Sequence, residues 1–126
     1  MERHYQLGLL YLIHLLISAD GITEQAELDA LHKIRSGEKI PESTFMEYES
    51  FTSVKSEKEI YQHGIKHLGL CSDLEKLKAF ATLYRLSEID GRVHVKEIRL
   101  LLYSVKRAGI EFNQVVDFAK SNPSLF

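Results

Sequence analysis

Ser18-Ala19-Asp20-Gly21 and Glu88-Ile89-Asp90-Gly91 are two related segments whose Asp-Gly pairs lie seventy positions apart. Each pair follows a stretch with the apolar spacing of a helix and precedes another such stretch. Each aspartate is followed, seven residues later, by a glutamate, which is Glu27 in the first copy and Glu97 in the second. A helix–turn–helix unit that is used twice explains this pattern, because such units bury their apolar faces against each other. The sequence therefore predicts a duplicated helical hairpin with a carboxylate at each bend.

The rest of the chain also favours helix, because glycine and proline are sparse and no segment shows a convincing alternation of apolar and polar residues. We expect an all-α fold of about seven helices in one compact bundle built on two pseudo-repeated helix pairs. Ser56 and Ser72 each open a capping box, and Asn113 is expected to cap the last helix. The expected helices cover approximately residues 3–18, 24–35, 42–53, 57–68, 73–88, 93–107 and 113–121.

The length of 126 residues fits a single domain, residues 1–126, that is large enough for a real core. We divide it into repeat one at 4–37, insert helices at 38–73, repeat two at 74–107 and a C-terminal helix at 113–121. The net charge of −2 does not favour nucleic-acid binding through the whole surface. Cys71 is the single cysteine, which excludes an intrachain disulfide and a thiolate metal cage.

Residues 7–17 (LGLLYLIHLLI) are apolar around nearly the whole helix. The hydrophobic part of a signal peptide is an alternative interpretation, with Ile17-Ser18-Ala19 as the cleavage site. However, the preceding residues carry no net positive charge, and the matching stretch at 74–86 lies deep in the chain. The stretch is also too short for a membrane span, which needs about 20 apolar residues. We therefore expect a first helix that is buried in the core.

The first Asp-Gly bend is a candidate cation site. An Asp-Gly with a glutamate seven residues later has the spacing of the second half of an EF-hand loop, but Leu16 stands where the first ligand would be. The bend is therefore not an EF-hand. Asp20, Glu24 and Glu27 nevertheless surround one helix entrance, and residues 4–32 contain no lysine or arginine. A hard divalent cation would relieve the repulsion between these carboxylates.

The second bend offers Asp90 and Glu97 as possible ligands, either alone or shared with the first bend if the repeats pack face to face. It is the weaker candidate, because Arg92, Lys96 and Arg99 already neutralise these acids. The ion that we expect, if one binds, is Ca²⁺, Mg²⁺, Mn²⁺ or Zn²⁺.

Both bends also have a purely structural interpretation. Acidic residues near a helix N-terminus stabilise the helix dipole by roughly 0.3–1 kcal/mol each, and Asp-Gly is an ordinary turn pair. Asp20 and Asp90 would then accept hydrogen bonds from backbone amides of the following helix.

The same segments, residues 17–27 and 88–97, resemble the TerB family, which includes the tellurite-resistance protein TerB and the TerB-type domain of DnaJ-like proteins. The resemblance covers about residues 4–107. It implies an all-helical fold with two Asp-Gly turns in pseudo-repeated helix pairs. It also implies a cytoplasmic bacterial module of tellurite resistance and stress response, without known enzyme activity, with a role in divalent-cation binding or membrane-associated signalling. The chain departs from the family pattern at Ile89 and in the basic stretch 92–96.

Two further groups of residues are candidates for binding. Basic residues recur at helical spacing around one tyrosine and predict a face that docks a protein partner or an anionic surface, unless it is simply the solvated side of the helix. The members of this basic face are Arg92, Lys96, Arg99, Tyr103 and Lys106. His63 and His67 lie four residues apart, as in some zinc sites, but no third ligand is nearby, and we expect a solvated or half-buried pair.

Three functions remain open at this stage. The first is a TerB-like, non-enzymatic module with a protein partner and a divalent cation at the Asp-Gly turns. The second is an interaction scaffold in which these turns are structural and the basic face makes the contact. The third and most remote is a metal-dependent hydrolase. We expect no catalytic residues, because no glycine-framed serine, no partner motif for Cys71 and no phosphate-binding glycine loop occurs.

Overall fold

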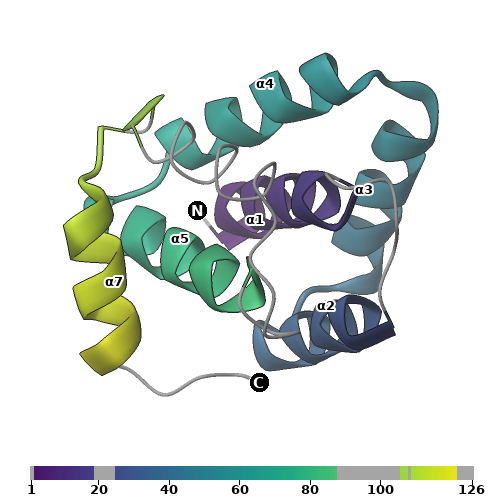
Figure 1. Cartoon of the computed structure of the whole chain (residues 1–126). Helices are drawn as coiled ribbons and strands as arrows, with labels where there is room; N and C mark the ends of the chain where they lie inside the picture. The colour runs from purple at the N-terminus through teal and green to yellow at the C-terminus, as the bar shows by residue number, and fades with distance from the viewer. Residues whose placement is uncertain (1, 19–24, 88–105, 108, 122–126) are drawn as a thin grey trace.

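The first helix is apolar on nearly every side, and the fold provides it with neighbours on every side (Figure 1). The structure is a computed structural model that describes residues 2–18, 25–87, 106–107 and 109–121. The described helices are α1 (Glu2–Ser18), α2 (Gln25–Gly37), α3 (Glu42–Val54), α4 (Glu57–Gly69), α5 (Asp73–Ser87) and α7 (Phe112–Ser121). Within these ranges no strand occurs, so the predicted all-α class is confirmed there.

Six of the seven expected helices are present, and most of their bounds agree within one or two residues. The other expected helix, at 93–107, lies outside the described residues except for its last two positions, which are helical. The duplication of the helix pair therefore stays a prediction, because the second member of repeat two falls in this range. The two helices of the expected insert at 38–73 are α3 and α4, and both of them contact α1.

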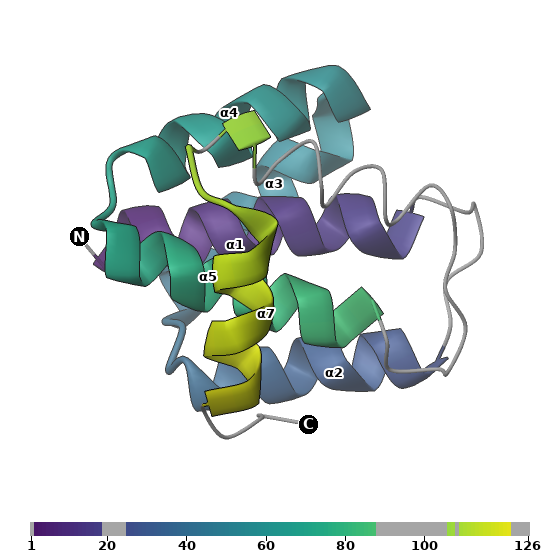
Figure 2. The same ribbon diagram turned by 60° about the vertical axis from the view of Figure 1, so that its left-hand side comes forward.

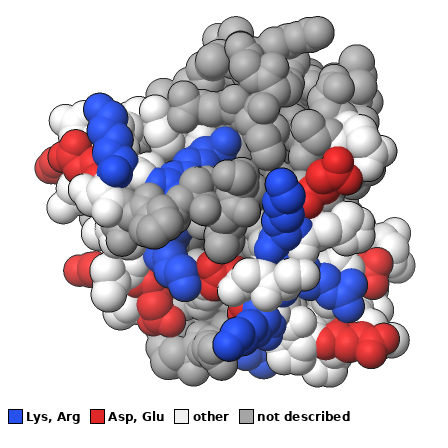
Figure 3. Space-filling view, turned by 90° about the horizontal axis from the view of Figure 1, so that it is seen from below, with Lys and Arg blue, Asp and Glu red and all other residues white. Residues whose placement is uncertain are grey.

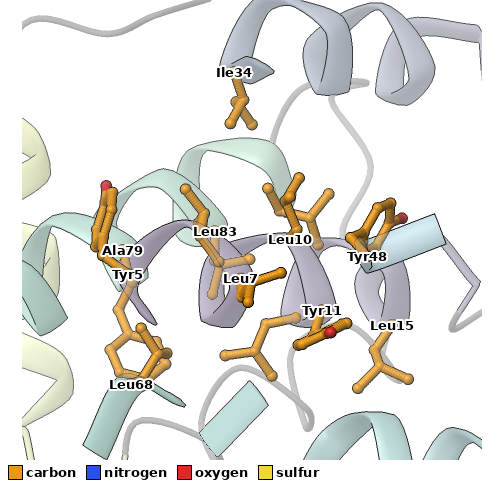
Figure 4. Close-up of a cluster of buried hydrophobic side chains, with 14 of the residues drawn as sticks. Tyr5, Leu7, Leu10, Tyr11, Leu15, Ile34, Tyr48, Leu68, Ala79 and Leu83 are labelled. Carbon is orange, nitrogen blue, oxygen red and sulfur yellow. The ribbon is translucent and has the colours of Figure 1, made fainter. Parts of the chain in front are cut away.

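Helix α1 forms the centre of the core. Leu7, Leu9, Leu10, Leu12 and Ile13 are at most 1% exposed. Burying one such side chain stabilises the fold by about 1.5–3 kcal/mol. Figure 4 shows the side chains of α1 between α2 on one side and α4 on the other. No helix in the described part of the chain is long and apolar enough to cross a membrane.

Helices α1 and α4 approach each other closely at two glycines. A Cβ atom placed on Gly8 would lie 2.7 Å from Cγ of Leu68 and 3.2 Å from the backbone oxygen of Gly64. A Cβ atom on Gly64 would lie 3.2 Å from that of Tyr11. Both positions therefore need the smallest residue, because a larger one would separate the two helix backbones.

Local sequence signals set the starts of α4 and α5. Ser56 accepts a hydrogen bond from the backbone N–H of Glu59, whose side chain accepts one from the backbone N–H of Ser56. The Ser72 backbone donates to the Glu75 side chain in the same way, at 3.0 Å. This hydrogen bond lowers the pKa of the exposed Glu75 carboxyl. Both predicted capping boxes are thus confirmed.

The predicted cap at Asn113 is wrong. Helix α7 begins one residue earlier, at Phe112, so Asn113 lies inside its first turn. Here the reciprocal contact comes from Gln114, whose side-chain oxygen accepts a hydrogen bond from the backbone N–H of Glu111 at 3.1 Å. The cap position is Glu111, and Gln114, three residues later, makes the side-chain contact at this helix start. The sequence predicts a capping contact from Asn113 instead.

The C-terminal helix completes the core on the far side of α5. In both views α7 lies against α5 (Figures 1 and 2). Val115 is fully buried, and the rings of Tyr84 and Phe112 meet edge to face at 5.7 Å. Edge-to-face pairs of this kind add about 0.5–1.5 kcal/mol to simple burial.

The close crossing of α1 and α4 predicts the effect of adding one methyl group. Gly8→Ala is expected to destabilise the protein by about 1–2 kcal/mol, because the steric cost exceeds the gain in helix propensity. Gly69→Ala is the matched control, since nothing lies within 4 Å of its Cβ position. Urea unfolding of both variants measures the difference. Equal stabilities for the two variants would contradict the close packing.

Candidate functional site

The two helices that precede the Asp-Gly segments in the sequence, α1 and α5, end on the same side of the bundle (Figure 2). Helices α1 and α5 contact each other and run in the same general direction, and Figure 2 shows both C-terminal ends on the same side of the bundle. Helix α1 ends at Ser18, two residues before the first Asp-Gly, and α5 ends at Ser87, three residues before the second. The helix ends that lead into the two predicted bends are therefore neighbours in space.

The electrostatics of the two helix ends differ. The C-terminal end of any helix carries a partial negative charge, which attracts cations. The last turn of α1 contains no basic residue, whereas the last turn of α5 contains Arg85. No basic side chain in the last turn of α1 therefore neutralises the partial negative charge at its C-terminal end. This difference favours the first bend over the second as a place for a cation.

Most of the predicted cation ligands are not among the residues that the structure describes. Asp20, Glu24, Asp90 and Glu97 lie outside the described residues, and Glu27 is placed only as backbone, in the first turn of α2. Among the described residues, no group of three His, Cys, Asp or Glu side chains is arranged to hold a metal ion. Convergence of the five acids therefore stays a prediction.

Most of the predicted basic face lies outside the description as well. Arg92, Lys96, Arg99 and Tyr103 are in the undescribed range, and Lys106 is exposed. On the face drawn in Figure 3, the described Lys and Arg side chains are interspersed with Asp and Glu side chains. The described surface in that view is thus of mixed charge.

A buried carboxylate, which sequence reasoning missed, links three parts of the fold. Glu38 follows α2, and its side chain is only 8% exposed. Its carboxylate accepts hydrogen bonds from Lys78 Nζ of α5 at 3.2 Å and from the Tyr5 hydroxyl of α1 at 3.3 Å. The Gln6 side chain donates to the backbone oxygen of Glu38 at 3.2 Å. This Glu38 network joins α1 and α5 to the connection between α2 and α3.

The Glu38 network borders a small polar pocket of about 120 Å³, which Glu75 also lines. Burial raises the pKa of the Tyr5 phenol, and the carboxylate of Glu38 raises it further. The Lys78 ammonium also lies 5.3 Å from the centre of the Tyr5 ring. The carboxylate and ammonium neutralise each other, and a phenol with a raised pKa is a poor nucleophile. The arrangement is suited to holding helices together.

A second polar group, the histidine cluster, lies between α1 and α4. The Nδ1 atoms of His4 and His67 are 2.9 Å apart, and the ring of His63 lies 4.9 Å from that of His67. His63 also stacks on Phe51 of α3 at 4.3 Å. The prediction of a solvated or half-buried pair is confirmed for His63, which is half-buried, and is wrong for His67, which is buried. The participation of His4 was missed, because it depends on how α1 and α4 cross.

His14, on α1, interacts with a tyrosine of α3. Its Nδ1 atom lies 3.3 Å from the hydroxyl of Tyr48 on α3, which can donate a hydrogen bond to it. Burial lowers the pKa of the His14 imidazole, so the neutral form is favoured.

In comparisons with known proteins, no family model matches the chain, and no curated protein or solved structure shows significant similarity to it. The resemblance to the TerB family therefore rests on the two Asp-Gly segments and their sequence context alone.

The Glu38 network predicts an effect on stability. Glu38→Ala is expected to destabilise the protein by about 2–3 kcal/mol, because it leaves the Tyr5 hydroxyl without its partner and removes the ion pair with Lys78. Glu38→Gln should cost less, since the amide can still accept from Tyr5. Glu49→Ala, at an exposed position of α3, serves as the control. Urea unfolding at pH 7 measures all three, and a Glu38→Ala variant as stable as Glu49→Ala would rule the network out as a stabilising element.

Proposed function

We propose that the protein is a TerB-like, non-enzymatic helical module that binds a divalent cation at its Asp-Gly turns. In this proposal it acts through a protein partner in a cytoplasmic stress response of the tellurite-resistance kind. The carrying observation is the shared location of the C-terminal ends of α1 and α5, from which both Asp-Gly segments continue (Figure 2). Because the two helices end on the same side of the bundle, we propose that carboxylates from both segments contribute to one cation site.

The electrostatics add a second line of support. The C-terminal end of α1 carries a partial negative charge with no basic side chain in its last turn, and it leads directly to Asp20. Glu27 follows within the first turn of α2. A hard cation prefers oxygen ligands of this type, and the negative helix end adds to its attraction. We therefore assign the principal ligands to Asp20, Glu24 and Glu27, with Asp90 and Glu97 as contributors from the second turn.

The partner is proposed to dock on the basic face, which contains Arg92, Lys96, Arg99, Tyr103 and Lys106. The exposure of Lys106 supports this assignment at one position. If the turns are purely structural, the same face would serve an interaction scaffold without a cation, and the experiment below separates the two functions.

Cation binding predicts a rise in thermal stability. Metal-free protein should melt about 5 °C or more higher with Ca²⁺, Mg²⁺, Mn²⁺ or Zn²⁺ at roughly 100 times the Kd, because binding to the folded state alone stabilises it by about 2.7 kcal/mol. The double variant Asp20→Asn/Glu27→Gln should lose the shift.

Glu42→Gln/Glu49→Gln is the matched control, because it removes the same number of charges from exposed positions on α3. This control should keep the shift in full. If no ion changes the melting temperature, cation binding is excluded and the interaction-scaffold function remains. A shift that persists in Asp20→Asn/Glu27→Gln would place the cation elsewhere.

A further inference from the structure

The pair His4 and His67 joins the first turn of α1 to the end of α4. Their Nδ1 atoms are 2.9 Å apart, and His67 is only 9% exposed. At this distance one ring donates its N–H to the bare nitrogen of the other. The neutral pair and the singly protonated pair can both form this bond. In the doubly protonated pair both Nδ1 atoms carry a proton, so no acceptor remains and two positive rings face each other.

We propose that the His4–His67 pair is an acid-sensitive latch, which holds the N-terminal turn of α1 against α4 and releases it when the pair takes up its second proton. The proposal is independent of the cation site. His4 precedes the end of α1 by fourteen residues, a distance of about 21 Å along the helix. Failure of one proposal therefore leaves the other intact.

The groups that face the latch favour the uncharged form of His67. Helix α1 contributes Arg3 and the Tyr11 ring, whose centre is 6.0 Å from that of His67. Helix α4 contributes His63, and the turn after it contributes the Cys71 thiol, which donates to the backbone oxygen of His67 at 3.5 Å.

Among the described residues, helix α3 contributes an opposing charge, Glu47, but this carboxylate forms an ion pair with Arg3. Burial is the main cause that lowers the pKa of His67, to about 4, and its cationic and imidazole neighbours add to the effect. An uncompensated second charge is thus poorly tolerated in this cluster.

The sign of the pH dependence follows from the lowered pKa. An unfolded chain binds the proton of this histidine with an ordinary pKa near 6.5, whereas the folded chain binds it only near pH 4. The contribution of the latch is therefore fully present above about pH 6.5 and is lost as the pH falls towards 4. Between pH 7 and 4.5 the unfolding equilibrium constant should rise on the order of 10–100-fold from this group.

Two measurements on the wild-type protein test the latch, both in EDTA so that metal capture by the imidazoles does not contribute. In NMR titrations the ring of His67 should stay uncharged to below pH 5, with the exposed ring of His32 as the internal reference. In hydrogen exchange, corrected for intrinsic rates, residues 2–8 and 63–69 should lose protection near pH 4.5 while α7 keeps it. An ordinary titration of His67 near pH 6.5, or a uniform loss of protection, would overturn the proposal.

Variants separate the latch from other acid-labile groups such as His14. Urea unfolding at pH 7 and at pH 4.5 gives the fold change in the unfolding equilibrium constant between these two pH values. This fold change should be at least tenfold smaller in His67→Gln than in the wild type, because glutamine does not titrate. His4→Gln should also reduce this pH dependence, because the variant removes the imidazole of His4 that contributes to the lowered pKa of His67. His32→Gln, at an exposed position of α2, should retain the wild-type dependence. Unchanged pH dependence in both His4→Gln and His67→Gln would exclude the latch.

Discussion

Burial of α1 around its whole circumference is the constraint on which the fold depends. A helix that is apolar on one face needs one partner, but α1 has buried residues at every position from Tyr5 to Ile13 and needs several. Helices α2, α3, α4 and α5 all contact it. The hydrophobic effect thus explains why segments far apart in the sequence gather around residues 2–18.

The polar groups next to this core fix the positions of the elements around it. The Glu38 network ties α5 and the connection after α2 to the first turns of α1. The histidine cluster ties α4 to the same part of α1 and reaches α3 through Phe51. Burying a polar group without a partner costs roughly 1–3 kcal/mol, so each group favours one arrangement of the helices. Both lie towards the N-terminal end of α1, and the Asp-Gly segments begin at the other end.

Features that depend on nearby residues were predicted well from the sequence. The capping boxes at Ser56 and Ser72 involve residues three positions apart, and the central place of the first helix follows from its composition. The contacts of Glu38 with Lys78 and of His4 with His67 join residues 40 and 63 positions apart. They depend on the crossing angles of helices, for which the sequence holds no local signal. The error at Asn113 arose from choosing the stronger capping residue over the reciprocal glutamine.

The glycine pair at the crossing of α1 and α4 has a mechanical consequence. The side chain of Leu68 covers the Cα of Gly8, and the α4 backbone lies directly beyond it. Sliding one helix along the other would force bulkier side chains into this contact, and a densely packed interior does not yield to that. The packing at this crossing therefore opposes sliding of α1 along α4.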